Sequence, residues 1–157
     1  MSLTYPSESK TVARPTILIV EDYHPQQFVF RQLCERFGYD AYIVGTGEAA
    51  LGALAIAQYA AVIMDINLPG IDGIETARQL RASEIGTGRH TPIIALTASG
   101  VPLLRETCLA AGMDDYMSKP FSVEAFRRLL LRWTYDSHRP NVSLITAAAG
   151  DDELLFG

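Results

Sequence analysis

Short, unbroken apolar runs alternate along the chain with longer segments in which apolar residues recur every three or four positions. The runs are Thr16–Val20, Ala41–Val44, Ala61–Met64, Pro92–Leu96 and Tyr116–Met117. An apolar run without polar alternation is typical of a strand that is covered on both faces, as in a parallel sheet between helices. The pattern therefore predicts five buried strands.

Each predicted strand is followed by a segment with the signals of a helix. These segments carry apolar residues at helical spacing, and Gly38 and Gly112 end the first and the fourth of them. The start signals are Pro25, Thr46, the capping-box sequence Asp72–Glu75, Pro102 and Ser122. The chain therefore predicts five amphipathic helices in alternation with the strands.

Five strand–helix units cover residues 14–135, and right-handed crossovers leave few ways to connect them. We expect an α/β fold of the flavodoxin-like, doubly wound (βα)5 type, with a five-stranded parallel sheet in the order 2-1-3-4-5. Residues 1–13 are interpreted as a polar N-terminal lead-in. Residues 136–157 contain Pro, Gly and a short apolar patch, and are interpreted as a linker or tail.

Composition narrows the class of protein. The chain has 157 residues, of which 48% are hydrophobic and 20% charged, which fits one soluble globular domain. The net charge is −5, so a basic footprint for nucleic acid is absent and no direct nucleic-acid partner is expected. No apolar run reaches about 18 residues, so no membrane insertion by this chain is expected. Cys34 and Cys108 lack CxxC spacing and are predicted to be buried thiols in a reducing, cytoplasmic setting.

Chemically reactive side chains come directly after the predicted strands. Glu21 and Asp22 follow the first, Asp65 the third, Thr97 the fourth and Lys119 the fifth. Ligands of open α/β sheets bind outside the carboxyl ends of the strands, beside the topological switch point. Taken singly, an acidic residue or a threonine at such a position more commonly belongs to a turn or caps a helix, and a lysine more commonly lies on the surface. As a set at one edge of the sheet, they favour a functional site.

Three carboxylates at one edge repel one another, by roughly 4 kcal/mol for a pair 4 Å apart at an effective dielectric constant near 20. Lys119 cannot neutralise all three, whereas a hard divalent cation such as Mg²⁺ prefers oxygen ligands and keeps room for a phosphate oxygen. A carboxylate in such a cluster can act as a nucleophile and form an aspartyl-phosphate. Mg²⁺, Lys119 and Thr97 would then stabilise the charge of the transferring group.

The residues at these strand ends resemble those of a known family, the receiver domains of two-component signalling. The likeness extends over about residues 14–135. The amino-acid sequence of the matching stretches is most similar to that of receiver domains attached to hybrid sensor histidine kinases. The matching stretches are ILIVED (17–22), VIMDINLPGIDG (62–73), PIIALTAS (92–99) and AAGMDDYMSKPF (110–121).

The resemblance implies a phosphoacceptor and a metal site. Asp65 aligns with the residue that is phosphorylated, and Asp22 aligns with a direct Mg²⁺ ligand. Glu21 aligns with an acid that acts on the metal through water. Asn67 would supply its backbone carbonyl as a further ligand. Tyr23 stands where kinase-linked members often have Asn, so the contacts beside the acids differ from the common pattern.

The resemblance also implies a conformational switch. Lys119 would contact a phosphoryl oxygen, and Thr97 would supply the hydroxyl that moves toward the phosphoryl group. Tyr116 aligns with the aromatic residue that turns inward when that hydroxyl moves, and a cis peptide bond is expected at Pro120. Asn67 and Ser99 occupy positions that tune dephosphorylation in the family.

By this resemblance, the phosphoryl donor is a phosphohistidine of a sensor histidine kinase domain or of a histidine phosphotransfer protein. The domain would assist its own phosphorylation and dephosphorylation without being an independent turnover enzyme. We expect a receiver from a hybrid sensor kinase, cytoplasmic and part of a membrane-anchored protein, with a stand-alone single-domain response regulator as the alternative.

Three other functions are compatible with parts of the sequence. A dinucleotide-binding Rossmann oxidoreductase is suggested by the G-x-G-x-x-A motif at Gly45–Ala50, with Asp65 placed 20 residues after Gly45. That motif follows the second predicted strand, however, and leaves Lys119 and Thr97 unexplained. A phosphatase with a second catalytic acid two residues after its nucleophile would have Asn67 there, which cannot donate a catalytic proton. A pseudo-receiver is disfavoured because the set of site residues is complete.

Overall fold

The computed structural model describes residues 13–98 and 104–135. Five strands alternate with five helices in this part of the chain, as predicted. The elements are β1 Thr16–Val20, α1 His24–Arg36, β2 Asp40–Val44, α2 Gly47–Ile56, β3 Ala61–Asp65, α3 Gly73–Glu84, β4 Ile93–Ala98, α4 Leu104–Ala110, β5 Asp115–Lys119 and α5 Val123–Tyr135. Four of the predicted features lie outside the described residues: nearly all of the lead-in, Ser99, Pro102 and the tail 136–157.

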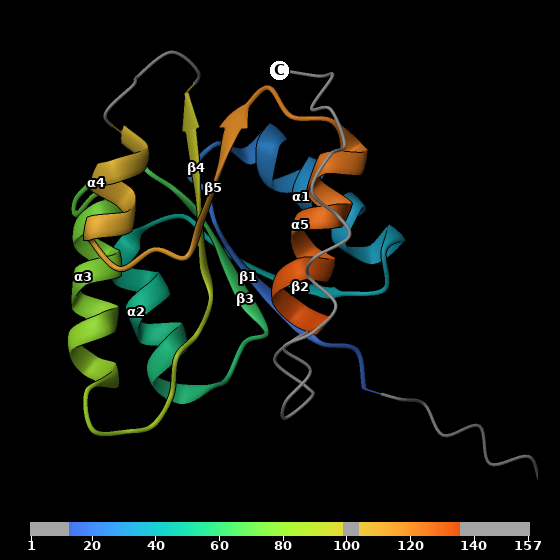
Figure 1. The fold of residues 1–157 in the computed structure, drawn as a ribbon. Coiled ribbons are helices and arrows are strands. Elements are labelled where there is room, and N and C mark those ends of the chain that lie inside the picture. Colours follow the sequence, from blue (N-terminus) through green and yellow to red (C-terminus); the bar gives the residue numbers. More distant parts are fainter. Residues whose placement is uncertain (1–12, 99–103, 136–157) are drawn as a thin grey trace, which may run out of the picture.

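The strands form one parallel sheet in the order β2-β1-β3-β4-β5, which confirms the predicted topology. Helices α1 and α5 cover one face of the sheet, and α2, α3 and α4 cover the other (Figure 1). The strand order reverses between β1 and β3, which pair with each other in parallel. The carboxyl ends of these two strands therefore mark the switch point, where an open α/β sheet binds its ligands.

Two hydrophobic layers hold the helices to the sheet. Alternate residues of β1, such as Ile17 and Ile19, pack with α1 and α5, while Leu18 and Val20 pack on the opposite face. The first layer includes an aromatic cluster of Phe30, Phe121 and Phe126. The central strands β1 and β3 are buried on both faces, so their sequences read as continuous apolar runs. The prediction of five buried strands is wrong for β2, which is partly exposed, with Tyr42 51% exposed, because it lies at the edge of the sheet.

Both cysteines are free thiols inside these layers, Cys34 against the α1 and α5 face and Cys108 against the other. Burial raises the pKa of the Cys34 thiol to about 12 and also raises the pKa of Cys108. Both side chains therefore act as small apolar residues of the core, as predicted.

Three strands end later than their apolar runs predicted. Asp65 is the last residue of β3, and Lys119 is the last residue of β5. Thr97 lies inside β4, which begins at Ile93 rather than at Pro92. The apolar runs end where the side chains become polar, but the hydrogen-bonded ladder continues and pairs Asp65 with Leu96 and Lys119 with Ala98. Three site residues are thus held by the sheet itself.

The predicted helix caps are present where the structure describes them. The side chains of Thr46, Asp72 and Ser122 accept backbone N–H groups of Ala49, Glu75 and Ala125 at 3.1, 2.8 and 3.0 Å. The predicted capping box is only half formed, because the Glu75 carboxylate contacts Arg78 and Gln79 instead of reaching back to the cap. Within residues 13–98 and 104–135, no helix is long and apolar enough to cross a membrane.

Gly73 lets the start of α3 lie against the end of β3. A Cβ atom at this position would lie 2.5 Å from the Asp65 carbonyl oxygen and 2.9 Å from the Ile66 Cα atom. Gly73→Ala should therefore lower the free energy of unfolding by roughly 1–3 kcal/mol, as overpacking does. The helical Gly52 has open space around it, so Gly52→Ala should raise that free energy by about 0.5–1 kcal/mol. Urea denaturation measures both, and equal effects of the two substitutions would contradict this account.

Candidate functional site

Three carboxylates gather at the switch point. Glu21 and Asp22 directly follow β1, and Asp65 ends the neighbouring β3. One oxygen from each lies within 4.8 Å of the others. Glu21 and Asp65 are only 2% and 7% exposed, whereas Asp22 is exposed. The cluster therefore concentrates negative charge at the switch point, and Asp22 is its solvent-exposed member.

Lys119 reaches the cluster from the end of β5. Its Nζ atom lies 3.2 Å from Glu21 Oε2 and 3.2 Å from Asp65 Oδ2. The Lys119 side chain is 31% exposed, so its ammonium group stays accessible from solvent while it bridges the two buried acids. One positive charge faces three negative ones, and the four ionised groups together carry −2.

Backbone and amide groups orient the acids. The Asn67 N–H donates to Asp65 Oδ1 at 2.9 Å, and the Tyr23 N–H donates to Glu21 Oε1 at 3.2 Å. The Gln27 side chain donates from Nε2 to the Glu21 backbone carbonyl at 2.6 Å. Gln27 was not predictable from the sequence, because no motif marks a side chain that folds back from the first turn of a helix onto the preceding loop.

The electrostatics of the cluster follow from this geometry. Burial raises the pKa of Glu21, and the charge of Asp65 raises this pKa further, while Lys119 offsets part of the shift. The acids are thus held together at a cost that Lys119 only partly relieves. Carboxylate oxygens at this spacing, with negative charge in excess, form a donor set that suits a hard divalent cation.

Thr97 and Tyr116 form a second group, on the α4 side of the sheet. Thr97 is 1% exposed, and its Oγ1 atom has no hydrogen-bond partner among the described residues. The Tyr116 phenol oxygen accepts a hydrogen bond from Ser118 Oγ at 2.8 Å. That bond lowers the pKa of Tyr116, and the Thr97 hydroxyl, close to the phenol but without a well-formed bond to it, lowers this pKa further.

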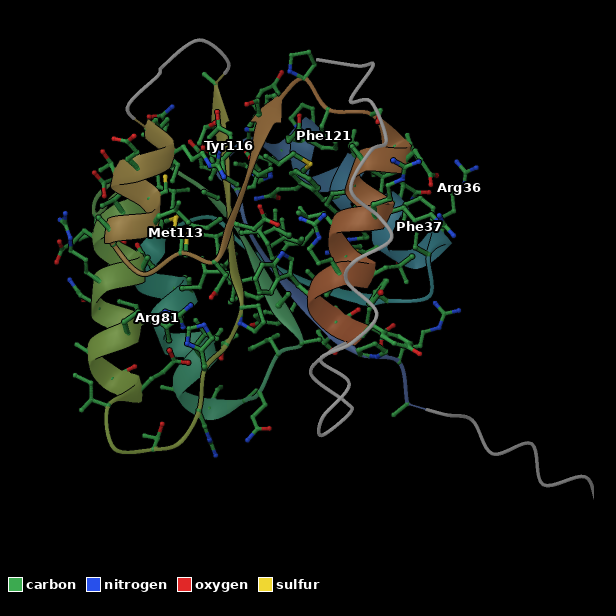
Figure 2. The ribbon with its side chains drawn as sticks, viewed as in Figure 1. Arg36, Phe37, Arg81, Met113, Tyr116 and Phe121 are labelled. Carbon is green, nitrogen blue, oxygen red and sulfur yellow. The ribbon has the colours of Figure 1, made fainter. Side chains whose placement is uncertain are left out.

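Strand alternation explains why the site residues divide into two groups. Ile63 and Met117 belong to the layer under α1 and α5, so Asp65 and Lys119, two residues further along, point to that same side. Thr97 follows Ala95, which belongs to the opposite layer. Figure 2 shows Tyr116 near α4 and Phe121 on the side of α1 and α5.

The sequence-predicted residues therefore lie at one edge of the sheet, but not all of them touch. The structure brings Glu21, Asp22 and Asp65 within 4.8 Å of one another, and Lys119 contacts Glu21 and Asp65. Thr97 lies one residue beyond Leu96, the register partner of Asp65, and makes no hydrogen bond to Asp65. The peptide bond between Lys119 and Pro120 is cis.

The glycine motif of the dinucleotide-binding alternative has a packing role. Gly45 lies between the edge strand β2 and α2, and Gly47 is the first residue of α2. A Cβ atom on Gly47 would lie 2.1 Å from Thr76 Oγ1 and 2.8 Å from Ile71 Cγ1. The second glycine therefore permits close contact between α2 and the α3 region, which accounts for it without a bound dinucleotide.

Comparisons with known proteins agree with the geometry. The family model described as response regulator receiver domain matches residues 17–131. The sensor histidine kinase GacS of Pseudomonas protegens is 33% identical over 130 residues, which cover 82% of this chain and 14% of GacS. The chain therefore spans about one seventh of the length of this relative.

Solved structures give the same result. The receiver domain of the sensor histidine kinase PA1611 from Pseudomonas aeruginosa, with a magnesium ion coordinated in its active-site cleft, is 40% identical, with a TM-score of 0.71 over 78% of this chain and 99% of that one. The receiver domain of Ssk1 from Saccharomyces cerevisiae, solved with the histidine phosphotransfer protein Ypd1, is 26% identical, with a TM-score of 0.75 over 85% of this chain and 97% of that one. With its fold, its acidic cluster and the family match over most of its length, this chain belongs to the response regulator receiver domain family.

Proposed function

We propose that this domain accepts a phosphoryl group from a phosphohistidine onto Asp65, in a reaction that requires Mg²⁺. The observation that carries the proposal is the cluster of Glu21, Asp22 and Asp65, bridged by Lys119 at the switch point. The magnesium ion in the cleft of the PA1611 receiver domain supports the same chemistry.

The residues present fit a magnesium ion. Asp22 and Asp65 would bind it directly, Glu21 would bind it through water, and the Asn67 backbone carbonyl would complete the protein ligands. The fit rests on three carboxylate oxygens within 4.8 Å of one another and on the buried negative charge that Lys119 leaves uncompensated. When bound, Mg²⁺ would neutralise charge on the acids and on the phosphoryl oxygens.

The transfer step follows from the orientation of Asp65. A carboxylate oxygen of Asp65 forms a bond to phosphorus, the N–P bond of the phosphohistidine breaks, and the imidazole nitrogen keeps the electron pair. The Asn67 N–H and the Lys119 ammonium already hold Oδ1 and Oδ2 of Asp65 at 2.9 and 3.2 Å, so the nucleophile is oriented before the donor arrives. Lys119 then contacts a phosphoryl oxygen.

The switch uses the second group of residues. The added phosphoryl charge attracts the Thr97 hydroxyl, which is buried and has no partner among the described residues. Its movement changes the surroundings of Tyr116 and with them the surface formed by α4, β5 and α5. This is a two-state element biased by a local change in charge.

The relatives favour a hybrid sensor kinase as the parent protein, with a histidine kinase domain or a histidine phosphotransfer protein as the donor. GacS is a sensor histidine kinase of which the matching region is a small part. The Ypd1 complex supports a phosphotransfer protein as a partner. Two buried free thiols suit a reducing compartment, so we place the domain on the cytoplasmic side.

The metal requirement tests this function. With a small-molecule acyl phosphate and MgCl₂, the domain should gain the mass of one phosphoryl group, and a chelator should prevent this. Asp22→Asn should weaken Mg²⁺ binding about tenfold or more in calorimetric titration, since the loss of even an outer-shell partner of a metal ligand costs 10–100-fold. The control is Asp40→Asn, at the exposed start of β2, which should bind Mg²⁺ like the parent chain. Equal labelling with and without Mg²⁺ would contradict the proposal.

A further inference from the structure

The loop of residues 66–72 joins β3 to α3 and carries Asn67. The Gly73 N–H donates to the Ile66 carbonyl at 3.0 Å and closes the base of the loop. Inside the loop, the Asn67 N–H donates to Asp65 Oδ1 at 2.9 Å. The conformation of this loop therefore decides where the backbone of Asn67 lies beside the Asp65 carboxylate.

Glu48, in the first turn of α2, contacts this loop on the side away from its base. Its Oε1 atom accepts the Ile71 N–H at 3.2 Å, a hydrogen bond between residues 23 positions apart in the sequence. The same carboxylate lies against Gly70, where a Cβ atom would be 2.8 Å from Oε1 and 3.2 Å from Oε2. Gly70 has a φ of +76°, so both the turn of the loop and the approach of the carboxylate require glycine at this position.

The neighbours of Glu48 favour the same contact between α2 and the loop. A Cβ atom on Gly47 would lie 2.8 Å from Ile71 Cγ1, so glycine makes room here for the Ile71 side chain. Leu68 of the loop is buried and belongs to the same hydrophobic layer as Ala50 of α2. The loop therefore lies against α2, and Glu48 supplies a hydrogen bond between them.

We propose that Glu48 is a positioning residue, which holds the 66–72 loop through the Ile71 N–H and thereby fixes the backbone of Asn67 for Mg²⁺ binding. The glycine motif at Gly45–Ala50 then serves the metal site, because it supports the loop that carries Asn67. The hold on the loop is a property of the metal-free domain. Only the consequence for Mg²⁺ rests on the proposed function.

Three variants separate the hydrogen bond of Glu48 from its charge. Glu48→Ala removes both, whereas Glu48→Gln removes the charge and keeps an amide oxygen that can accept the Ile71 N–H. Glu75→Ala is the control for charge. It removes an equal charge from the first turn of α3, where the Glu75 carboxylate contacts Arg78 and Gln79 of the same helix.

Amide NMR of the metal-free, ¹⁵N-labelled domain tests the hold on the loop. In Glu48→Ala, the Ile71 amide hydrogen should exchange with solvent roughly fivefold faster, the value of one typical intramolecular hydrogen bond. The Asn67 amide resonance should shift in the same variant. In Glu48→Gln and Glu75→Ala, both amides should behave as in the parent chain. An Asn67 resonance that does not respond to Glu48→Ala would overturn the proposal, because a contact with a merely local role at Ile71 would not reach Asn67.

Calorimetric titration with MgCl₂ tests the consequence for the metal site. Glu48→Ala should bind Mg²⁺ about three- to fivefold more weakly, because the effect is limited to the value of one hydrogen bond. Glu48→Gln should bind Mg²⁺ like the charge control Glu75→Ala. Equal losses in Glu48→Ala and Glu48→Gln would assign the effect to charge and overturn the proposal.

The two measurements also separate this proposal from the proposed function. A parent chain that does not bind Mg²⁺ would refute the proposed function, while the amide exchange would still decide whether Glu48 holds the loop. A parent chain that binds Mg²⁺, with unchanged affinity in Glu48→Ala, would refute the role of Glu48 alone.

Discussion

Asp65→Asn is expected to abolish labelling by an acyl phosphate in the presence of Mg²⁺. The labelled fraction should be no higher than in protein that was not given the acyl phosphate. The amide cannot form the acyl-phosphate bond, because its nitrogen occupies one ligand position and its oxygen is a poor nucleophile. The substitution keeps the size of the side chain and removes one of three mutually repelling charges, so the fold should persist. Intact-protein mass spectrometry measures the loss.

The matched control for this prediction is Asp40→Asn. Asp40 is exposed at the start of β2, while Asp65 is the buried last residue of β3. The control should label like the parent chain. Full labelling of Asp65→Asn, with the circular dichroism spectrum unchanged, would exclude Asp65 as the phosphoacceptor.

Phe126→Ala is expected to lower the free energy of unfolding by about 3–5 kcal/mol, the usual cost of removing a buried phenylalanine. Phe126 is fully buried on α5, and its ring centroid lies 5.6 Å from that of Phe30 and 5.6 Å from that of Phe121. The ring therefore connects α5 and the segment after β5 to α1. Urea denaturation of the purified domain measures the change.

Leu131→Ala is the control on the same helix. Leu131 is 42% exposed, so its loss should change the free energy of unfolding by no more than about 0.5–1 kcal/mol. Similar losses for the two variants would mean that the aromatic cluster does not anchor α5.

The fold was predictable because its signals are local. A strand that is buried on both faces reads as an apolar run, and a capping side chain such as Thr46 or Asp72 lies three residues before the N–H that it accepts. The order of the strands then followed from crossover handedness and from the two-sided cover of the sheet. The ends of the strands were not predictable to the residue, because polar side chains such as Asp65 and Lys119 still pair in the ladder.

The residues that form the site could be predicted from the sequence, but which of them contact one another could be predicted only in part. The strand ends placed Glu21, Asp22, Asp65 and Lys119 at one edge, and the structure brings them together. That Thr97 lies on the other face of the sheet depends on the register of β4, which the sequence does not mark. The contacts of Gln27 and Ser118 depend on side-chain conformation in three dimensions, so sequence reasoning had no signal for them.

Locating the phosphoryl group in the parent chain decides whether Asp65 is the residue that carries it. The domain is labelled with an acyl phosphate and Mg²⁺, and the aspartyl-phosphate is reduced with borohydride, which converts the labelled aspartate to homoserine. Peptide mass spectrometry then reads the position. We expect homoserine at residue 65. Homoserine at any other aspartate, or phosphate retained on a serine, threonine or histidine with Asp65 unmodified, would contradict it.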